Sequence, residues 1–268
     1  MQISMLLEAY QKERRSAGYS PQTIERVVLN VQMYCREAHV RRLDRMTTGS
    51  ILSWGNDKFN EGKRQSTVYA YYNSLRSFVG YLDEIKVPHT VDKERIHCKP
   101  VYERLTVLRP ADVHRIIDAA ENSQTALLIR MMYTSGMRIS EAISLRPNML
   151  DGTEAYIKGK GNKVRTVFFT KDVVIGLAKI ESGNEPFFNF NRSIAYYKIK
   201  KAMVDAGYPN AYPHSLRHTF TTTLLRNGAT LSHVQRLLGH SNISTTQRYE
   251  HLVTDDIKRA HQKYLREV

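Results

Sequence analysis

The chain of 268 residues has only two cysteines, Cys35 and Cys98. Their spacing resembles neither a zinc knuckle nor a disulfide framework. We therefore expect two reduced thiols in a cytoplasmic protein, with Cys35 packed on a helix.

Long apolar runs are also missing. No stretch approaches the ~20 residues that a membrane-spanning helix needs, and the N-terminus lacks the cationic and then apolar pattern of a signal peptide. The sequence has no glycine-rich phosphate loop and no cluster of carboxylates suited to Mg²⁺. We expect no metal, no nucleotide cofactor and no membrane partner.

Positive charge is abundant. Forty Lys and Arg residues oppose 26 Asp and Glu residues, a formal net charge of +14. Residues 1–105 carry a net +5 and the remainder +9, so no single tail accounts for the excess. Such an imbalance favours a polyanionic partner, although a generally basic, soluble surface would give the same totals.

The first part of the chain, 1–95, has the pattern of a small helical bundle. Apolar residues recur with helical period over 3–16, 48–60 and 66–85, and Ser20 followed by Pro21 suits the start of a further helix. The aromatic residues of the last helix are interpreted as core: Tyr69, Tyr71, Tyr72, Phe78 and Tyr81. Periodicity is lost before residues 96–105, which we interpret as a linker between two domains.

Cationic and hydroxyl side chains at three places are candidate DNA contacts. Helix starts and basic side chains commonly hold phosphates, but a solvated basic face has the same sequence signature. The candidates are Lys63, Arg64, Ser66 and Thr67 before the fourth helix, Lys163 and Arg165 near a hairpin, and Lys198 and Lys201 on a later helix.

The remaining residues, 106–268, read as helices interrupted by one small β-element. Strands are predicted at 155–157 and 164–169, joined by a glycine-containing turn. The helix at 125–133 is apolar nearly all round and should be buried. The other helices are expected at 110–120, 137–145, 171–180, 192–206, 213–227, 231–238, from 244, and at 255–266.

Candidate catalytic groups gather in this second part. His214 and Arg217 stand three residues apart at a helix start, where the positive end of the helix dipole favours anions. His218 shares their face, and we interpret it as a packing residue. Arg138 follows a glycine, and Glu141, one turn later, is placed to orient it.

Three further groups complete the set. Lys160 lies at the predicted hairpin tip, His240 follows the helix cap Gly239, and Tyr249 comes nine residues later. Each would be ordinary alone, but in this order they match one chemistry, the attack of a tyrosine on a DNA phosphate.

The chain resembles the tyrosine recombinase (phage integrase) family, particularly its compact Xer-like members, over nearly its whole length. The matching segments are TSGMRISEAISL, IKGKGNKVRTV, HSLRHTF and LLGHSNISTTQRY, with SPQTI as a looser match. The resemblance implies a mainly α fold with a small β-hairpin: a core-binding bundle at 1–95 and a catalytic domain at 106–268, closing as a C-shaped clamp around double-stranded DNA.

The chemistry of the side chains fits this resemblance. Arg138 and Arg217 can donate forked hydrogen bonds to phosphate oxygens, and His240 adds a donor. A tyrosine hydroxyl ordinarily has a pKa of about 10, so Tyr249 needs help to lose its proton at neutral pH. His214 is the expected base or hydrogen-bond partner.

The family resemblance also implies the general acid and the product. Lys160 would protonate the departing 5′-oxygen, leaving a 3′-phosphotyrosyl bond and a free 5′-hydroxyl without ATP or metal. The helix at 255–266, with Tyr264 as an apolar contact, would pack on a neighbouring protomer of a tetramer on paired half-sites, or back on its own domain. Free protein would be a monomer or weak dimer, and accessory proteins are possible.

Two other functions share parts of this pattern. A type IB topoisomerase uses the same chemistry as a monomer, and a DNA-binding or architectural protein would carry the catalytic residues as relics. The complete set of six catalytic positions favours a recombinase.

Overall fold

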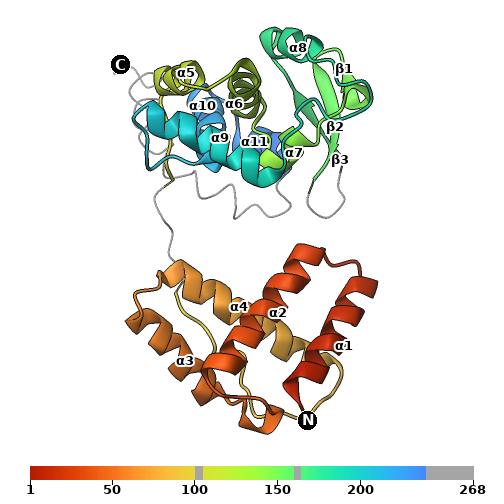
Figure 1. The fold of residues 1–268 in the computed structure, drawn as a ribbon, viewed down its shortest axis with the longest axis vertical. Coiled ribbons are helices and arrows are strands. Elements are labelled where there is room, and N and C mark those ends of the chain that lie inside the picture. Colours follow the sequence, from red (N-terminus) through yellow and green to blue (C-terminus); the bar gives the residue numbers. More distant parts are fainter. Residues whose placement is uncertain (100–104, 160–163, 240–268) are drawn as a thin grey trace, which may run out of the picture. The chain divides into compact units, whose positions relative to one another are not determined.

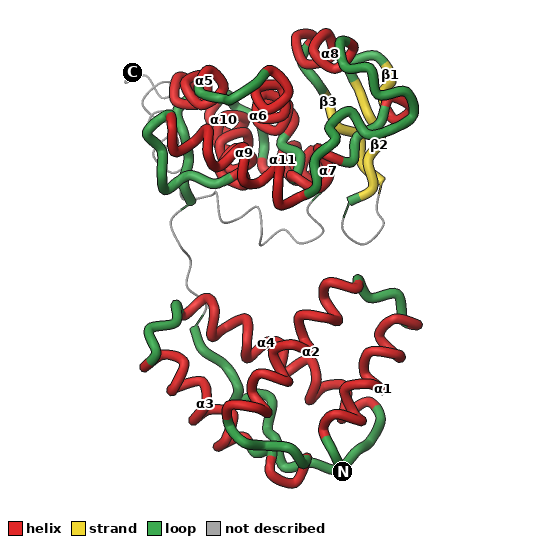
Figure 2. Tube along the Cα trace, in the orientation of Figure 1, coloured by secondary structure: helices red, strands yellow, loops and turns green. Residues whose placement is uncertain are grey.

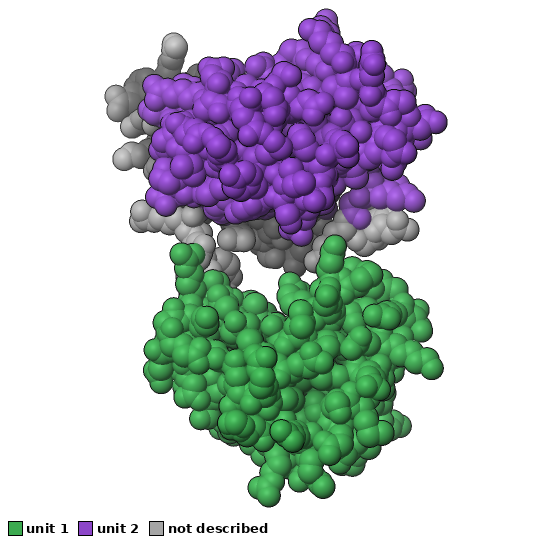
Figure 3. All heavy atoms as spheres, in the orientation of Figure 1, with its two compact units in different colours: residues 1–103 green, residues 104–268 purple. Residues whose placement is uncertain are grey.

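The computed structural model describes residues 1–99, 105–159 and 164–239 (Figure 1). The chain divides into two compact units, 1–103 and 104–268, which Figure 3 colours separately. Each unit has its own hydrophobic core. Helices dominate both units, and the strands among the described residues belong to the second (Figure 2), so the predicted fold class, mainly α with a small sheet, is confirmed.

The first unit is a bundle of α-helices. Ser20 accepts a hydrogen bond from the Thr23 N–H at 3.2 Å and Pro21 takes the first helical position, as the sequence predicts. The observed helices agree with the predicted ranges to within two residues. They are α1 (Ile3–Ser16), α2 (Pro21–Glu37), α3 (Thr48–Asn60) and α4 (Gln65–Glu84), with a short 3₁₀ helix, η1 (Leu43–Arg45).

The core of this unit lies between α2 and α4. Val31, Leu75 and Phe78 are completely buried, and burying one such side chain stabilises a fold by about 1.5–3 kcal/mol. The prediction that the α4 aromatics belong to the core holds for Tyr72, Phe78 and Tyr81. It is wrong for Tyr69, which is 37% exposed, because its position falls on the outer side of α4.

The segment after α4 packs back on the first unit. The Asp92 N–H donates to Thr48 Oγ1 at 2.8 Å, and Ile96 is completely buried in the core. The first unit therefore extends past residue 95, where the sequence placed its end.

The second unit is built around α6 (Ser123–Ser135). Leu128, Ile129, Met131 and Met132 are buried on this helix, as predicted from its apolar composition. It contacts the helices and the strand that surround it (Figure 1). The other helices are α5 (Pro110–Asp118), α7 (Ile139–Ile143), α8 (Lys171–Ala178), α9 (Arg192–Asp205), α10 (Pro213–Arg226) and α11 (Leu231–Leu238), with a 3₁₀ helix, η2 (Pro147–Met149).

A small antiparallel sheet occupies one end of the second unit (Figure 2). Its strands are β1 (Leu150–Asp151), β2 (Glu154–Lys158) and β3 (Val164–Phe168), in the order β1-β2-β3. The hairpin of β2 and β3 was predicted. The sequence did not predict β1, because two residues are too few to show an alternating pattern.

None of the helices in the described part of the chain combines the length and apolarity that a membrane crossing requires.

The start of α5 is joined to the segment after α9 by one carboxylate. Asp112, 5% exposed, accepts hydrogen bonds from Arg109 Nε and Nη2, both at 3.0 Å, and from the Tyr208 hydroxyl at 2.7 Å. These bonds, that from Arg109 first, hold the pKa of Asp112 well below its usual range. Ionised Asp112 therefore stabilises the second unit.

We expect Asp112→Asn to lower the melting temperature at neutral pH by a few degrees. Because the folded-state pKa is depressed, this contribution is present above the unfolded pKa of about 4 and is lost as the pH falls below it. The gap between variant and native protein should narrow from pH 7 to pH 3 in thermal unfolding followed by circular dichroism. Asp118→Asn, on the same helix outside this hydrogen-bonded cluster, is the control. An unchanged gap at all pH values would contradict this account.

Candidate active site

Arg217 on α10 is the most deeply buried charged candidate, with 2% of its surface exposed. Its Nη1 donates to the Gly136 carbonyl at 2.6 Å and its Nη2 donates to the Leu238 carbonyl at 2.8 Å. Both carbonyls lie at helix C-termini, those of α6 and α11, where the helix dipole is negative. The guanidinium therefore joins two helix ends that are distant in sequence.

Gly136 is required at the end of α6 for two reasons. Its φ of +65° is a left-handed conformation, which glycine adopts without strain. A Cβ at this position would also lie 2.4 Å from Cδ1 of Phe220, a distance that packing forbids. The bare backbone lets α10 approach the chain two residues before Arg138.

Arg138 and Glu141 form a closed pair at the start of α7. The Arg138 N–H donates to Glu141 Oε2 and its Nη1 donates to Glu141 Oε1, both at 2.8 Å. The Arg138 side chain is 31% exposed and that of Glu141 only 7%. Buried Glu141 therefore binds both the backbone and the guanidinium of Arg138, and part of the Arg138 side chain reaches the surface.

His214 lies one turn before Arg217 and is exposed. His218 is 6% exposed, and its ring meets the His214 ring edge-on at a centroid distance of 4.7 Å. The ring of Tyr212 lies 6.4 Å from that of His218. His218 thus packs beneath His214, in agreement with the structural role that the sequence favoured for it.

The placement of Arg165 corrects the sequence prediction. We expected Arg165 to contact DNA, but its side chain is only 8% exposed and its Nη2 donates to Glu141 Oε2 at 2.8 Å. On β3 it alternates with Thr166 and shares the inward face with Val167, which is 1% exposed. This parity was readable from the sequence and is the signal that the prediction missed. Burial lowers the pKa of the Arg165 guanidinium, and the Glu141 carboxylate opposes that shift.

The two lysines predicted on α9 form ion pairs with the protein itself. Lys198 pairs with Glu121 and lies 5.6 Å from the centroid of the Phe190 ring. Lys201 Nζ lies 2.5 Å from Asp205 Oδ2, four residues further along the helix. Their contact with DNA stays a prediction, and it would require a phosphate to replace each of these carboxylate partners.

At the start of α4, Lys63, Arg64 and Ser66 are exposed, and Thr67 is partly buried. Arg64 occupies the N-cap position and its side chain makes no capping hydrogen bond. The predicted phosphate contacts here stay untested, with the side chains on the surface.

Four of the predicted residues, Lys160, Lys163, His240 and Tyr249, lie outside the described residues. So do Tyr264 and the predicted helices from 244 and at 255–266. Among the described elements, β2 ends at Lys158, shortly before Lys160. Helix α11 and its cap Gly239 come before His240 and Tyr249.

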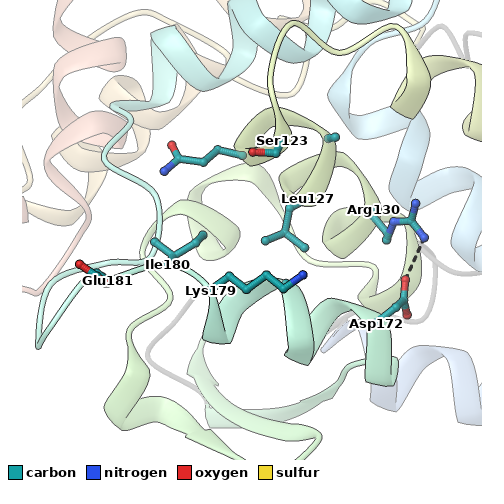
Figure 4. A pocket seen from close by; sticks show the side chains of 10 residues that line it. Ser123, Leu127, Arg130, Asp172, Lys179, Ile180 and Glu181 are labelled. Atoms are coloured by element: carbon teal, nitrogen blue, oxygen red, sulfur yellow. Dashed lines mark hydrogen bonds and ion pairs between the residues drawn. The ribbon is translucent and has the colours of Figure 1, made fainter.

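A separate cavity of about 620 Å³ lies between α6 and α8. In Figure 4 the ion pair of Arg130 Nη1 with Asp172 Oδ2, at 2.9 Å, closes one side of it, near Leu127 and Lys179. None of the described candidate residues lines this cavity. The candidate active site is instead the surface formed by the start of α7 and the start of α10.

We expect Arg217→Lys to destabilise the second unit by about 2–4 kcal/mol, because an ammonium cannot span both carbonyls and one acceptor loses its buried partner. Urea unfolding followed by circular dichroism measures this. Arg226→Lys, exposed in the last turn of α10, should change stability by less than about 0.5 kcal/mol. Equal stability of the two variants would show that the Arg217 bonds are not structural.

Comparison with known proteins gives a consistent result. The model of the phage integrase family matches residues 106–255. "Tyrosine recombinase XerD" of Rickettsia prowazekii is 27% identical, over 96% of this chain and 94% of its own. "Tyrosine recombinase" of Pseudothermotoga lettingae is 31% identical, over 73% of each chain.

Two solved structures share the fold. The chain of a lambda integrase (75–356) dimer bound to a core site has a TM-score of 0.76 at 16% identity, with 91% of this chain and 97% of that chain covered. XerA recombinase has a TM-score of 0.54 at 21% identity, with 99% of each chain covered. The chain therefore belongs to the phage integrase family, the tyrosine recombinases, which are enzymes that transfer DNA strands in site-specific recombination.

Proposed function

We propose that this recombinase cleaves double-stranded DNA by attack of the Tyr249 hydroxyl on a backbone phosphate. The new bond joins Tyr249 Oη to phosphorus as the bond from phosphorus to the 5′-oxygen breaks. The products are a 3′-phosphotyrosyl link and a free 5′-hydroxyl. Because the link conserves the energy of the phosphodiester, a 5′-hydroxyl of another strand reverses the reaction without ATP or metal.

The observation that carries this proposal is the convergence of Arg138, Glu141, Arg165 and Arg217 from three distant segments of the chain. They are linked through Glu141 and through the Gly136 carbonyl. Three guanidiniums and one carboxylate leave a formal charge of +2. A phosphodiester carries one negative charge, and its pentacoordinate transition state gains another when a phenolate attacks. A fixed site of this charge stabilises the transition state more than the ground state.

The individual roles follow from exposure and chemistry. Arg138 donates to a phosphate oxygen, and Arg217 supplies charge from a rigid position below the surface. Removing one such preorganised donor costs about 3–4 kcal/mol of barrier. His214 takes the proton of Tyr249, His240 adds a donor, and Lys160 protonates the 5′-oxygen.

We assign DNA binding to both units. The basic start of α4, with Lys63, Arg64, Ser66 and Thr67, contacts phosphates from the first unit. Lys163, Lys198 and Lys201 do so from the second. In this proposal the first unit is the core-binding domain and the second unit is the catalytic domain. Solved structures with the same fold include the lambda integrase dimer bound to a core site and XerH bound to its difH substrate.

The working assembly in this proposal is a tetramer on two synapsed sites in the cytoplasm, with monomer or weak dimer when free. The segment at 255–266 packs on a neighbouring protomer, and accessory proteins direct the exchange where direction is needed. A type IB topoisomerase activity is not favoured, because the curated relatives are named recombinases.

Covalent trapping tests the proposal. Native protein and Tyr249→Phe are incubated in EDTA with nicked suicide duplexes made from DNA that flanks the gene, and the products are separated on denaturing gels. We expect a protein–DNA band with native protein and none with the variant, while both bind DNA equally in gel shifts. Binding without an adduct would leave a DNA-binding protein, and plasmid relaxation without exchange between two sites would indicate a topoisomerase.

The role of Lys160 has its own test. We expect Lys160→Ala to cleave an ordinary duplex at least about 100-fold more slowly, the scale of general acid catalysis. A duplex with sulfur in place of the bridging 5′-oxygen has a leaving group that needs no proton, so cleavage by the variant should return to within about tenfold of native. Tyr249→Phe should not recover on either duplex. If Lys160→Ala is equally slow on both, another group is the acid.

A further inference from the structure

Arg165 carries a charge into the interior of the second unit. Its cross-strand partner on β2 is Ile157, 4% exposed, and the adjacent inward residue of β3 is Val167, 1% exposed. A buried ion pair seldom stabilises a fold more than apolar side chains of similar volume would. The core could therefore accept an apolar residue here, and stability does not explain the charge.

Within the described parts of the chain, the Arg165 side chain has a partner for only one of its three nitrogen atoms. Only its Nη2 has a partner, Glu141 Oε2 at 2.8 Å, while Nε and Nη1 are buried without one among the described residues. Unpaired buried donors weaken a fold. The guanidinium is bound to Glu141 although the burial of its other donors costs stability. We infer that the bond to Glu141 has a functional role.

Glu141 is the point at which Arg165 meets Arg138. Oε2 accepts from both the Arg165 Nη2 and the Arg138 N–H, and Oε1 accepts from Arg138 Nη1. Arg138 is the partly exposed member, at 31%, while the other two side chains are at least nine-tenths buried. Arg165 thus binds the same carboxylate as Arg138, from a buried position.

The same side chain also packs against the end of α11. A Cβ on Gly239 would lie 2.6 Å from Arg165 Cδ and 3.0 Å from Nε, so only a glycine lets the two approach. Next to it, the Leu238 carbonyl accepts from Arg217, which also donates to Gly136, two residues before Arg138. These contacts form a closed circuit, which we call the inner network: Gly136, Arg138, Glu141, Arg165, Gly239, Leu238 and Arg217.

We propose that Arg165 is a positioning residue of the recombination reaction, which acts on the scissile phosphate through Glu141 and Arg138. It makes no contact with DNA. It holds the Glu141 carboxylate so that Arg138 is aimed at the surface, and its charge keeps the inner network cationic although Glu141 is present. This inference rests on the proposed function of Arg138 as a phosphate donor.

The test is Arg165→Met in the full chain. Methionine has a similar length, packs over Gly239 and leaves Glu141 paired with Arg138. We expect the melting temperature and the dissociation constant for DNA to stay close to native. The first-order cleavage rate at saturating DNA should fall about 10- to 100-fold, the effect of a misplaced charge at a reacting centre. Arg165→Lys, which keeps one donor and the charge, should recover part of that loss.

A second readout distinguishes positioning from general damage. A duplex with a methylphosphonate at the scissile position lacks one phosphate charge, so cleavage depends less on aimed arginines. The loss caused by Arg165→Met should be several-fold smaller on this duplex. Arg130→Met removes the arginine of the ion pair with Asp172, between α6 and α8, and should leave cleavage unchanged on both duplexes.

The outcomes separate the inference from the function on which it rests. If native protein forms no Tyr249 adduct on any duplex, the proposed function fails and this inference falls with it. If native protein cleaves and Arg165→Met cleaves within about twofold of it, only the role of Arg165 is refuted. An equal loss on both duplexes, or a loss explained by weaker DNA binding or unfolding, would refute it as well.

Discussion

Two hydrogen bonds from the buried guanidinium of Arg217 to helix-end carbonyls are the constraint on which the rest of the site depends. Gly136 and Leu238 stand about 100 residues apart in sequence, on the scale of a whole domain, and both carbonyls belong to helix ends with a left-handed glycine cap. Helix C-termini present unpaired carbonyls and negative dipole ends. A single arginine satisfies one carbonyl at the end of each helix, and so joins the C-terminus of α6 to that of α11.

The charged side chains of the inner network lie next to these two helix ends. Arg138 precedes α7 as its N-cap, two residues after Gly136, and Gly239 meets the side chain of Arg165. Because Arg165 and Arg138 share Glu141, the inner network closes on itself. In the proposed reaction, a closed network of this kind would hold its charges in place before the substrate arrives, so that little reorganisation would be needed.

The sequence predicts the helices of both units and the β2–β3 hairpin, because these elements have clear apolar periods and caps. It also indicates that Glu141 lies within reach of Arg138, since the two stand three positions apart at the start of a helix. It did not predict that Arg165 is a partner of Glu141, although the inward parity of β3 was available. The acceptors of Arg217 could not be predicted, because main-chain carbonyls of distant segments leave no sequence signal.

The DNA contacts of the first unit also leave no complete signal in the sequence. Basic residues before α4 are visible in the sequence, and the structure places Lys63, Arg64 and Ser66 on the surface at a helix start without a side-chain cap. Neither the pattern nor the surface identifies a base. Specificity depends on groove contacts, which require the DNA itself.

In the proposed reaction, the charges of the inner network stabilise the attack of one nucleophile, the hydroxyl of Tyr249. The most direct measurement is tandem mass spectrometry of the trapped adduct after nuclease and protease digestion. We expect one modified peptide, containing Tyr249 with a 3′-phosphonucleotide on its phenolic oxygen. A nucleotide attached to any other residue, such as Tyr212 or Tyr264, would contradict the account.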